Sequence, residues 1–262
     1  MAGTIDRESV QALVSRRAWD EGVHVAAYAT RELRPVEVTL LVRYRDELSG
    51  RVLELGCGAG RLTGYLAELA EEAVGLDVSP AMVDYCRQRY PRGRFELGDL
   101  RDLCQQSDEA WTVVFASFNV IDVLDDDERS RTLDEIARML APDGLLIFSS
   151  HNRAAAVEGP LRLHRSGPLH LAAELARMPR RLRNHRRLRR FECERSDYAI
   201  RNDGALDYSL LHYYIDRDES ERQLRAHGFE LLECLDLDGA QVGPGASVSD
   251  CPELHYVARR VR

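Results

Sequence analysis

The sequence predicts an α/β protein built on a doubly wound, mostly parallel sheet, and three observations lead to this fold class. Five short apolar runs alternate with helical segments between residues 51 and 150. A glycine-rich turn directly follows the first of these runs. The chain has 262 residues, of which 44% are hydrophobic, so it is long enough to bury a core of one large domain.

The first segment, residues 5–48, has a helical pattern. One apolar stripe consists of Val10, Leu13 and Val14, and a second follows Pro35, a residue type that favours the first turn of a helix. A glycine at the end of this segment is expected to terminate its last helix.

Strands and helices then alternate. Strands are expected at 51–56, 73–78, 94–99, 111–118 and 145–150, with helices at 60–70, 80–90 and 126–140 between them. Such alternation places consecutive strands side by side in parallel, with helices on both faces of the sheet.

The pattern changes after His151. Residues 153–190 are rich in arginine and helical in character, with no strand signal. Asn202-Asp203-Gly204 then predicts a hairpin turn between strands at 196–201 and 206–215. A helix at 217–227 and strands at 229–237 and 253–260 complete the chain.

Composition excludes several classes of protein. All 36 basic residues are arginine, so the chain has no lysine for a pyridoxal-phosphate Schiff base or for a nucleotide-binding P-loop. The six cysteines form no CxxC pair, and we expect no metal. No apolar run predicts a membrane span and the first residues do not resemble a signal peptide, so we expect a cytoplasmic protein.

The glycine-rich turn Gly56-Cys57-Gly58-Ala59-Gly60 marks the candidate ligand site. Glycines let a backbone approach a ligand closely, and a helix follows. The next strand ends at Asp77, whose carboxylate is placed to bind the two hydroxyls of a ribose. These features fit either a dinucleotide or S-adenosylmethionine (SAM). The dinucleotide fingerprint requires a glycine at position 61, where this chain has Arg61.

The segment ELGCGAGR around this turn resembles motif I of the class I SAM-dependent methyltransferases. The segments GDL (98–100), FASFNVIDVL (115–124) and PDGLLIFSSHN (142–152) resemble later motifs of that family, in the same order. The resemblance implies a seven-stranded class I methyltransferase sheet, mostly parallel with an antiparallel last strand, and an inserted helical and hairpin cap. The SAM-binding residues that it implies are Tyr28, Glu54, Gly56, Cys57, Gly58, Gly60, Arg61, Asp77, Met82, Asp99, Leu100 and Phe118.

The acceptor site is expected at the end of the fifth strand. His151 is the candidate general base because imidazole exchanges protons near neutral pH, although a histidine that only holds the loop is the alternative. Candidate acceptor contacts are Asn119, Asn152, His212 and Tyr214, of which the last two share one face of a strand. Packing roles remain open for all of them.

We therefore expect four parts: an N-terminal helical lid (1–48), a SAM-binding core (49–151), an inserted cap (152–208) and the end of the core sheet (209–262). The expected reaction is methyl transfer from SAM to an oxygen or nitrogen of a small metabolite. Because of the arginine-rich segment, an anionic or carrier-bound metabolite remains an open alternative. The alternatives are a SAM-using enzyme without methyl transfer, such as a cyclase, a nicotinamide-dependent oxidoreductase, and a nucleic-acid-binding module. The net charge of −8 disfavours the last, and the oligomeric state stays open.

Overall fold

A computed structural model describes residues 25–162, 167–246 and 248–261. The central sheet follows the order β3-β2-β1-β4-β5, and β10 and β9 continue it beyond β5. Strands β1 to β5 are parallel, and β10 runs antiparallel to both of its neighbours. The strands are β1 (Arg51–Leu55), β2 (Glu72–Asp77), β3 (Arg94–Leu97), β4 (Trp111–Ala116), β5 (Leu140–Asn152), β9 (Phe229–Leu235) and β10 (Glu253–Arg260). This arrangement confirms the predicted seven-stranded fold class.

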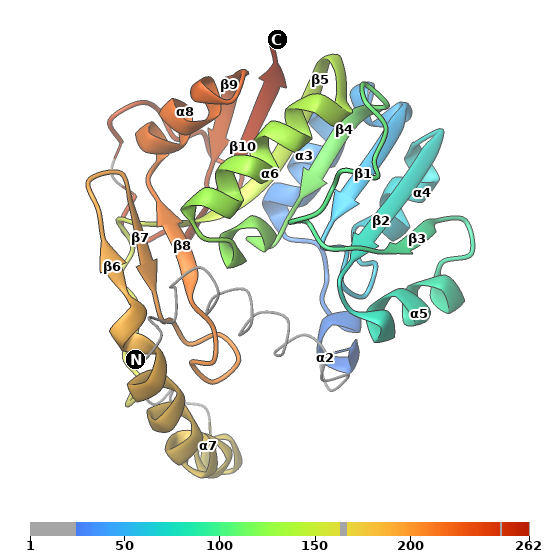
Figure 1. Cartoon of the computed structure of the whole chain (residues 1–262). Coiled ribbons are helices and arrows are strands. Elements are labelled where there is room, and N and C mark those ends of the chain that lie inside the picture. Colours follow the sequence, from blue (N-terminus) through green and yellow to red (C-terminus); the bar gives the residue numbers. More distant parts are fainter. Residues whose placement is uncertain (1–24, 163–166, 247, 262) are drawn as a thin grey trace, which may run out of the picture.

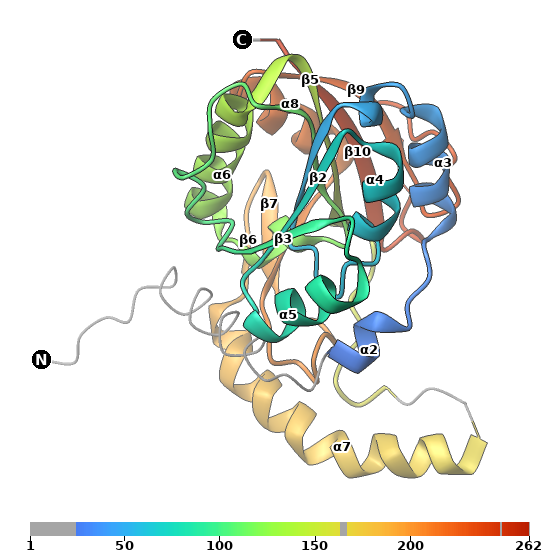
Figure 2. The same ribbon diagram turned by 90° about the vertical axis from the view of Figure 1, so that its right-hand side faces the viewer.

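Helices cover both faces of the sheet, as Figures 1 and 2 show. One face packs against α6 (Asp126–Met139) and α8 (Arg217–Ala226). The other packs against α3 (Pro35–Arg43) and α4 (Thr63–Leu69). Side chains alternate along β1, with Leu53 and Leu55 facing α6 and Val52 facing α3. Helix α5 (Pro80–Arg89) and α2 (Val25–Ala29) lie near the carboxyl ends of the strands.

The N-terminal segment differs in part from its prediction. Residues 1–24, including the stripe Val10, Leu13 and Val14, lie outside the described residues. The second stripe forms α3, which begins at Pro35 as expected and packs its apolar face on the sheet. The helix ends at Arg43, and a 3-10 turn (η2, Glu47–Ser49) leads to Gly50. Within the described part of this segment, α2 contributes Tyr28 to the wall of the main cavity.

A hairpin and a long helix extend from the end of β5. Because β4 ends at Ala116, the longer β5 has a free edge at His151 and Asn152, and β8 pairs there in parallel. Strand β8 pairs with β7, and β7 pairs with β6, both in antiparallel orientation. These elements, with the helices beside them, are α7 (Gly167–Leu188), η4 (Arg189–Phe191), β6 (Cys193–Glu194), β7 (Tyr198–Arg201) and β8 (His212–Ile215).

The predicted two-strand hairpin is present, but its turn is longer than the Asn-Asp-Gly signal indicates. The strands stop at Arg201 and resume at His212, and Leu206, Asp207 and Tyr208 all have positive φ. The Asn202 side chain donates hydrogen bonds to the carbonyls of Tyr208 (3.0 Å) and Leu210 (2.5 Å), which holds this loop folded. Strand pairing is therefore replaced by a compact loop over 202–211.

The described helices include none long and apolar enough to cross a membrane. Helix α7 is the longest of them, with 22 residues, and carries many arginines on exposed positions.

Candidate functional site

A cavity of about 390 Å³ lies at the carboxyl ends of β1, β2, β4 and β5, with α2 and the hairpin loop along its rim. Open α/β sheets bind ligands at this edge. The structure brings fourteen of the predicted site residues to its wall: Tyr28, Glu54, Gly56, Cys57, Gly58, Arg61, Asp77, Met82, Asp99, Leu100, Phe118, Asn119, His151 and His212. Gly60, Asn152 and Tyr214 do not line it.

The glycine turn after β1 forms one wall of the cavity. Gly56 and Gly58 have φ of 66° and 54°, a left-handed conformation that favours glycine. A Cβ on Gly56 would lie 2.0 Å from the side chain of Val120, whereas a Cβ on Gly58 would meet no atom within 4 Å. Gly58 therefore presents bare backbone to open space, which suits close approach of a ligand.

Gly60 does not line the cavity, and its surroundings show a packing role. A Cβ there would come within 2.9 Å of Cys86 and Tyr90, side chains of the α5 region rather than the cavity. This glycine allows the turn to pack against the neighbouring helix. Its predicted contact with the ligand stays a prediction.

Asp77 ends β2 opposite the glycine turn. Its carboxylate accepts hydrogen bonds from the backbone N–H groups of Gly58 (2.7 Å) and Ser79 (2.9 Å). Burial raises the pKa of Asp77, and these hydrogen bonds oppose the rise. A carboxylate oxygen accepts more than one hydrogen bond, so Asp77 both fixes the turn and keeps lone pairs for a ligand hydroxyl.

Glu54 lies buried beneath the turn and accepts a hydrogen bond from the hydroxyl of Thr63. Burial raises the pKa of Glu54 to about 8, so its carboxyl is protonated at neutral pH. It supports the first turn of α4 and the loop before it, in agreement with a structural role beside the cavity.

We expect the stability of Glu54→Gln, relative to the wild type, to rise with pH. An unfolded glutamate ionises above about pH 4.5, whereas folded Glu54 keeps its proton up to about pH 8. Between these pH values the native state binds one more proton than the unfolded state. The contribution of Glu54 to the free energy of unfolding therefore falls by about 1.4 kcal/mol for each pH unit. Glutamine does not titrate. Denaturant unfolding of both proteins from pH 4.5 to 8 measures the difference, and a difference independent of pH contradicts this expectation.

Arg61 is paired within the protein. Its guanidinium donates to the buried carboxylate of Glu37 in α3, with Nη2 2.7 Å from Oε1. Its Nη1 also donates to the carbonyl of Glu32 at 3.2 Å. Arg61 lines the cavity, but its charge is already matched, so its position favours anchoring the glycine turn to α3 over binding a ligand carboxylate.

The far end of the cavity is formed by the segment after β3. Asp99 accepts hydrogen bonds from the backbone N–H (3.0 Å) and the guanidinium (3.2 Å) of Arg101, and Arg101 also contacts Glu128 at 2.9 Å. Leu100 and Met82 add apolar surface. The result is a flat apolar end with one carboxylate, which suits a purine ring and its exocyclic amine.

Aromatic and cationic side chains close the side next to α2. The Tyr28 ring meets Phe118 edge-on with centroids 6.3 Å apart. The guanidinium carbons of Arg31 and Arg34 lie 4.7 and 4.2 Å from the centroid of the Phe118 ring. These contacts hold α2 against the end of β4.

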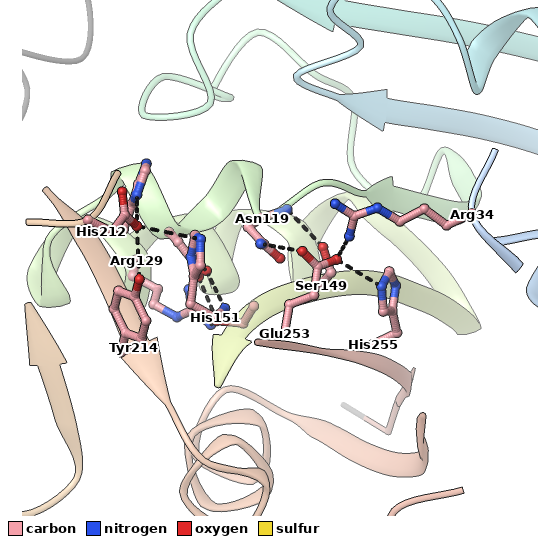
Figure 3. Close-up of polar contacts among 12 residues, drawn as sticks. Arg34, Asn119, Arg129, Ser149, His151, His212, Tyr214, Glu253 and His255 are labelled. Atoms are coloured by element: carbon pink, nitrogen blue, oxygen red, sulfur yellow. Dashed lines mark hydrogen bonds and ion pairs between the residues drawn. The ribbon is translucent and has the colours of Figure 1, made fainter. Parts of the chain in front are cut away.

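Phe118 and Asn119 turn the chain sharply after β4. Both have left-handed backbone, with φ of 60° and 58°, which is uncommon outside glycine and brings both side chains to the cavity. The amide nitrogen of Asn119 donates to Glu253 at 3.0 Å, and its backbone N–H donates to Ser149 at 2.8 Å (Figure 3). Asn119 Oδ1 is buried and has no partner among the described residues.

Glu253 holds this group of side chains together. It pairs with Arg34 and accepts from Nε2 of His255 at 3.1 Å (Figure 3). Burial lowers the pKa of His255 to about 4, so its imidazole is neutral and acts as a donor. Asn119 is thereby fixed with its amide oxygen available to a ligand donor.

His151 is held by a buried carboxylate. Its Nδ1 lies 2.7 Å from Asp122 Oδ2, and its backbone N–H donates to the same oxygen at 2.6 Å. The other oxygen of Asp122 accepts from Arg129 (2.7 Å) and Ser150 (2.6 Å), as Figure 3 shows in part. Burial alone would raise the pKa of Asp122, but the hydrogen bond from His151 and the charge of Arg129 lower it. An ionised Asp122 carboxylate accepts a hydrogen bond from Nδ1–H, so this contact favours the tautomer with its proton on Nδ1.

A second carboxylate approaches from the hairpin loop. Asp203 Oδ2 lies 2.7 Å from His212 Nδ1 and accepts from the Tyr214 hydroxyl at 2.9 Å. It lies 3.8 Å from His151 Nε2. Burial opposes ionisation of both members of the pair, yet the pKa of Asp203 is lowered and that of His212 is raised by their mutual attraction.

Within the part of the chain that the structure describes, His151, Asp203 and His212 form one group of three potential metal ligands, with ligating atoms within 4.8 Å of one another. Two imidazoles and a carboxylate can bind a transition metal. Here the two imidazole rings stack, with centroids 4.9 Å apart and planes at 20°, and Asp203 is satisfied by hydrogen bonds. We propose no metal at this group.

Asn152 was predicted to contact the acceptor, and the structure corrects this. Its amide nitrogen donates to the carbonyls of Val248 and Cys251, both at 2.9 Å, and its oxygen accepts from the backbone N–H of Ala154. These three hydrogen bonds connect the loop after β5 to the segment before β10 and use both donors and the oxygen of the Asn152 side chain. Tyr214 does not line the main cavity: its ring stacks on that of His151, with centroids 4.8 Å apart, and its hydroxyl donates to Asp203 at 2.9 Å.

Five residues of the site were missed from the sequence: Arg34, Arg101, Asp122, Asp203 and Glu253. Asp122 stands within the quoted segment FASFNVIDVL, and Asp203 stands within the recognised hairpin turn, so acidic residues inside those motifs were the available signals. Arg34 and Glu253 are far apart in sequence and carry no local signal.

Part of the chain is similar to known methyltransferases. Residues 52–144 match the family of methyltransferase domains. A probable SAM-dependent methyltransferase of Mycolicibacterium smegmatis is 36% identical over 112 residues, which is 42% of each chain. Trans-aconitate 2-methyltransferase of Variovorax paradoxus is 33% identical over 145 residues, covering 51% of this chain and 54% of that protein. The matched segments thus span about half the length of these curated relatives.

The fold agrees over a longer stretch. The 1,6-didemethyltoxoflavin N1-methyltransferase of Burkholderia thailandensis, solved with S-adenosylhomocysteine, has a TM-score of 0.63 at 17% identity and covers 100% of this chain and 94% of its own. The match to a methyltransferase domain over residues 52–144 and the shared fold agree with the resemblance to class I SAM-dependent methyltransferases that the motifs indicate.

Proposed function

We propose that the protein binds SAM in the 390 Å³ cavity and transfers its methyl group to an oxygen or nitrogen atom of a small molecule. One observation carries this proposal: a single cavity joins the glycine turn and Asp77 at one end to Asn119 and His151 at the other. The methyltransferase domain match supports the choice of reaction.

The residues fit the cofactor. The open cradle at Gly58 admits its methionine part, Asp77 accepts from the ribose hydroxyls, and the apolar end beside Leu100 takes the adenine. When bound, SAM supplies an electrophilic methyl group on a sulfonium leaving group. The task of the protein is to align an acceptor with that methyl and to exclude water.

The acceptor is proposed to bind between Asn119 and His151. Asn119 Oδ1 and His151 Nε2 are both hydrogen-bond acceptors facing this cavity, so the reacting group presents an O–H or N–H. His151 Nε2 takes the proton as the new bond to carbon forms, and Asp122 stabilises the resulting imidazolium. Asp122 acts here as a positioning residue.

Product analysis tests the proposed reaction. The protein is incubated with SAM and a panel of hydroxylated and aminated small molecules, and the cofactor products are identified by mass spectrometry. Methyl transfer predicts S-adenosylhomocysteine in equal amount to a methylated acceptor. Methylthioadenosine without a methylated product would instead establish a SAM-using reaction without methyl transfer.

His151→Gln is expected to lower kcat by about 10²- to 10⁴-fold with an acceptor whose reacting atom carries a proton, because the general base is lost. The affinity for SAM should not change. His227→Gln is a matched control, since His227 also pairs with an aspartate, Asp134, at 2.7 Å but lies away from the cavity. An unchanged kcat in His151→Gln would contradict the assigned role.

We also propose a cytoplasmic location, which the six free cysteines support.

A further inference from the structure

A second cavity, of about 270 Å³, lies on the other side of His151. Its wall includes Arg181 of α7, Asp203 and Tyr208 of the hairpin loop, and Val157 of the segment after β5. His151 lines this cavity and the main one, so the two share a wall at the proposed base. A molecule bound beside His151 therefore lies next to both cavities.

Arg181 stands out among the arginines of α7. Its Nε is buried and has no hydrogen-bond partner among the described residues, and its guanidinium carbon lies 5.7 Å from the centroid of the Tyr208 ring. None of the ion pairs between described residues includes it, whereas Arg180 lies 3.8 Å from Asp207. A buried guanidinium N–H without an acceptor costs stability, which a ligand oxygen would recover.

The acidic groups of this cavity are already engaged. Asp203 Oδ2 lies 2.7 Å from His212 Nδ1 and accepts a hydrogen bond from the Tyr214 hydroxyl at 2.9 Å. The carboxylate of Glu158 pairs with Arg162 at 2.8 Å, and its carbonyl accepts from the Tyr208 hydroxyl at 2.7 Å. Among the described residues of this wall, Arg181 is thus the charge without a counterion.

We propose that the second cavity binds an anionic group of the methyl acceptor, a carboxylate or a phosphate, through the guanidinium of Arg181. This inference rests on the proposed methyl transfer and adds the chemical class of the acceptor. The reacting atom lies beside His151, and the anionic group extends past the hairpin loop to α7. A planar guanidinium binds either anion through two parallel hydrogen bonds.

The test uses inorganic phosphate and malonate as separate probes on the full chain. The Nε–H resonance of Arg181 is assigned by its loss from the NMR spectrum of Arg181→Gln. Each anion is then titrated in the presence of saturating S-adenosylhomocysteine. We expect a saturable shift of this resonance with at least one probe, and the stronger response distinguishes a phosphate from a carboxylate acceptor.

The variants make the outcome decisive. Anion affinity, measured for every variant by calorimetry with S-adenosylhomocysteine present, should fall by about 10- to 150-fold in Arg181→Gln, the loss of a charged hydrogen bond, and partly return in Arg181→Lys. Arg183→Gln, which removes an exposed arginine of the same helix, should behave as the wild type. No saturable shift with either anion, or equal affinity in Arg181→Gln, overturns the inference. Calorimetry with S-adenosylhomocysteine alone tests the cofactor site separately. A protein that does not bind this cofactor product can therefore be distinguished from one that binds it but does not bind the anion.

Discussion

Arg129→Met is expected to lower the free energy of unfolding by about 3–5 kcal/mol, because it leaves the Asp122 carboxylate buried without its ionic partner. The two side chains are 1% and 0% exposed and lie 2.7 Å apart. The guanidinium also donates to Gln223 at 2.9 Å and lies 4.6 Å from the centroid of the Tyr213 ring. Methionine fills a similar volume but replaces none of these contacts. Urea unfolding measures the change.

Arg131→Met is the matched control, since Arg131 lies on the same helix but is exposed and contacts only the Asp127 carbonyl in the hydrogen bonds of the described residues. Its expected effect is within about 0.5 kcal/mol. Equal, small losses in both variants would show that the buried Asp122–Arg129 pair does not stabilise the fold.

Asp77→Ala is expected to weaken SAM binding by about 10- to 150-fold, which corresponds to the loss of one charged hydrogen bond. The effect has two sources. The ribose loses its acceptor, and the backbone N–H of Gly58 loses the carboxylate that fixes the glycine turn. Isothermal titration of both proteins with SAM gives the ratio of dissociation constants.

Asp84→Ala provides the comparison for this measurement, because Asp84 is an exposed acid on the neighbouring helix α5, with 68% of its side chain accessible. Its affinity for SAM should equal that of the wild type. If Asp77→Ala binds SAM as tightly as Asp84→Ala, the ribose is held elsewhere.

The sheet could be predicted from the sequence because its signals are local. Apolar runs of strand length, the glycine turn and the acid at the end of β2 each lie within a few neighbouring residues. The order of the segments then fixed the place of the cavity, and most of the predicted cofactor contacts line it. The packing role of Gly60 could not be predicted in this way, because it depends on Cys86 and Tyr90, which lie more than twenty residues further along the chain.

The polar network around His151 could not be predicted, since its partners come from separate segments. Asp122 follows β4, Arg129 belongs to α6, and Asp203 comes from the hairpin loop. Sequence spacing does not show which of these meet. Asn152 illustrates the same limit, because its neighbours in space, Val248 and Cys251, are nearly a hundred residues away and turn a candidate ligand contact into a loop anchor.

A crystal structure of the protein with S-adenosylhomocysteine tests the central claim most directly. It should show the ribose hydroxyls on Asp77, the adenine beside Asp99 and Leu100, and the sulfur directed toward Asn119 and His151. A cofactor bound outside this cavity, or a sulfur turned away from His151, would contradict the account.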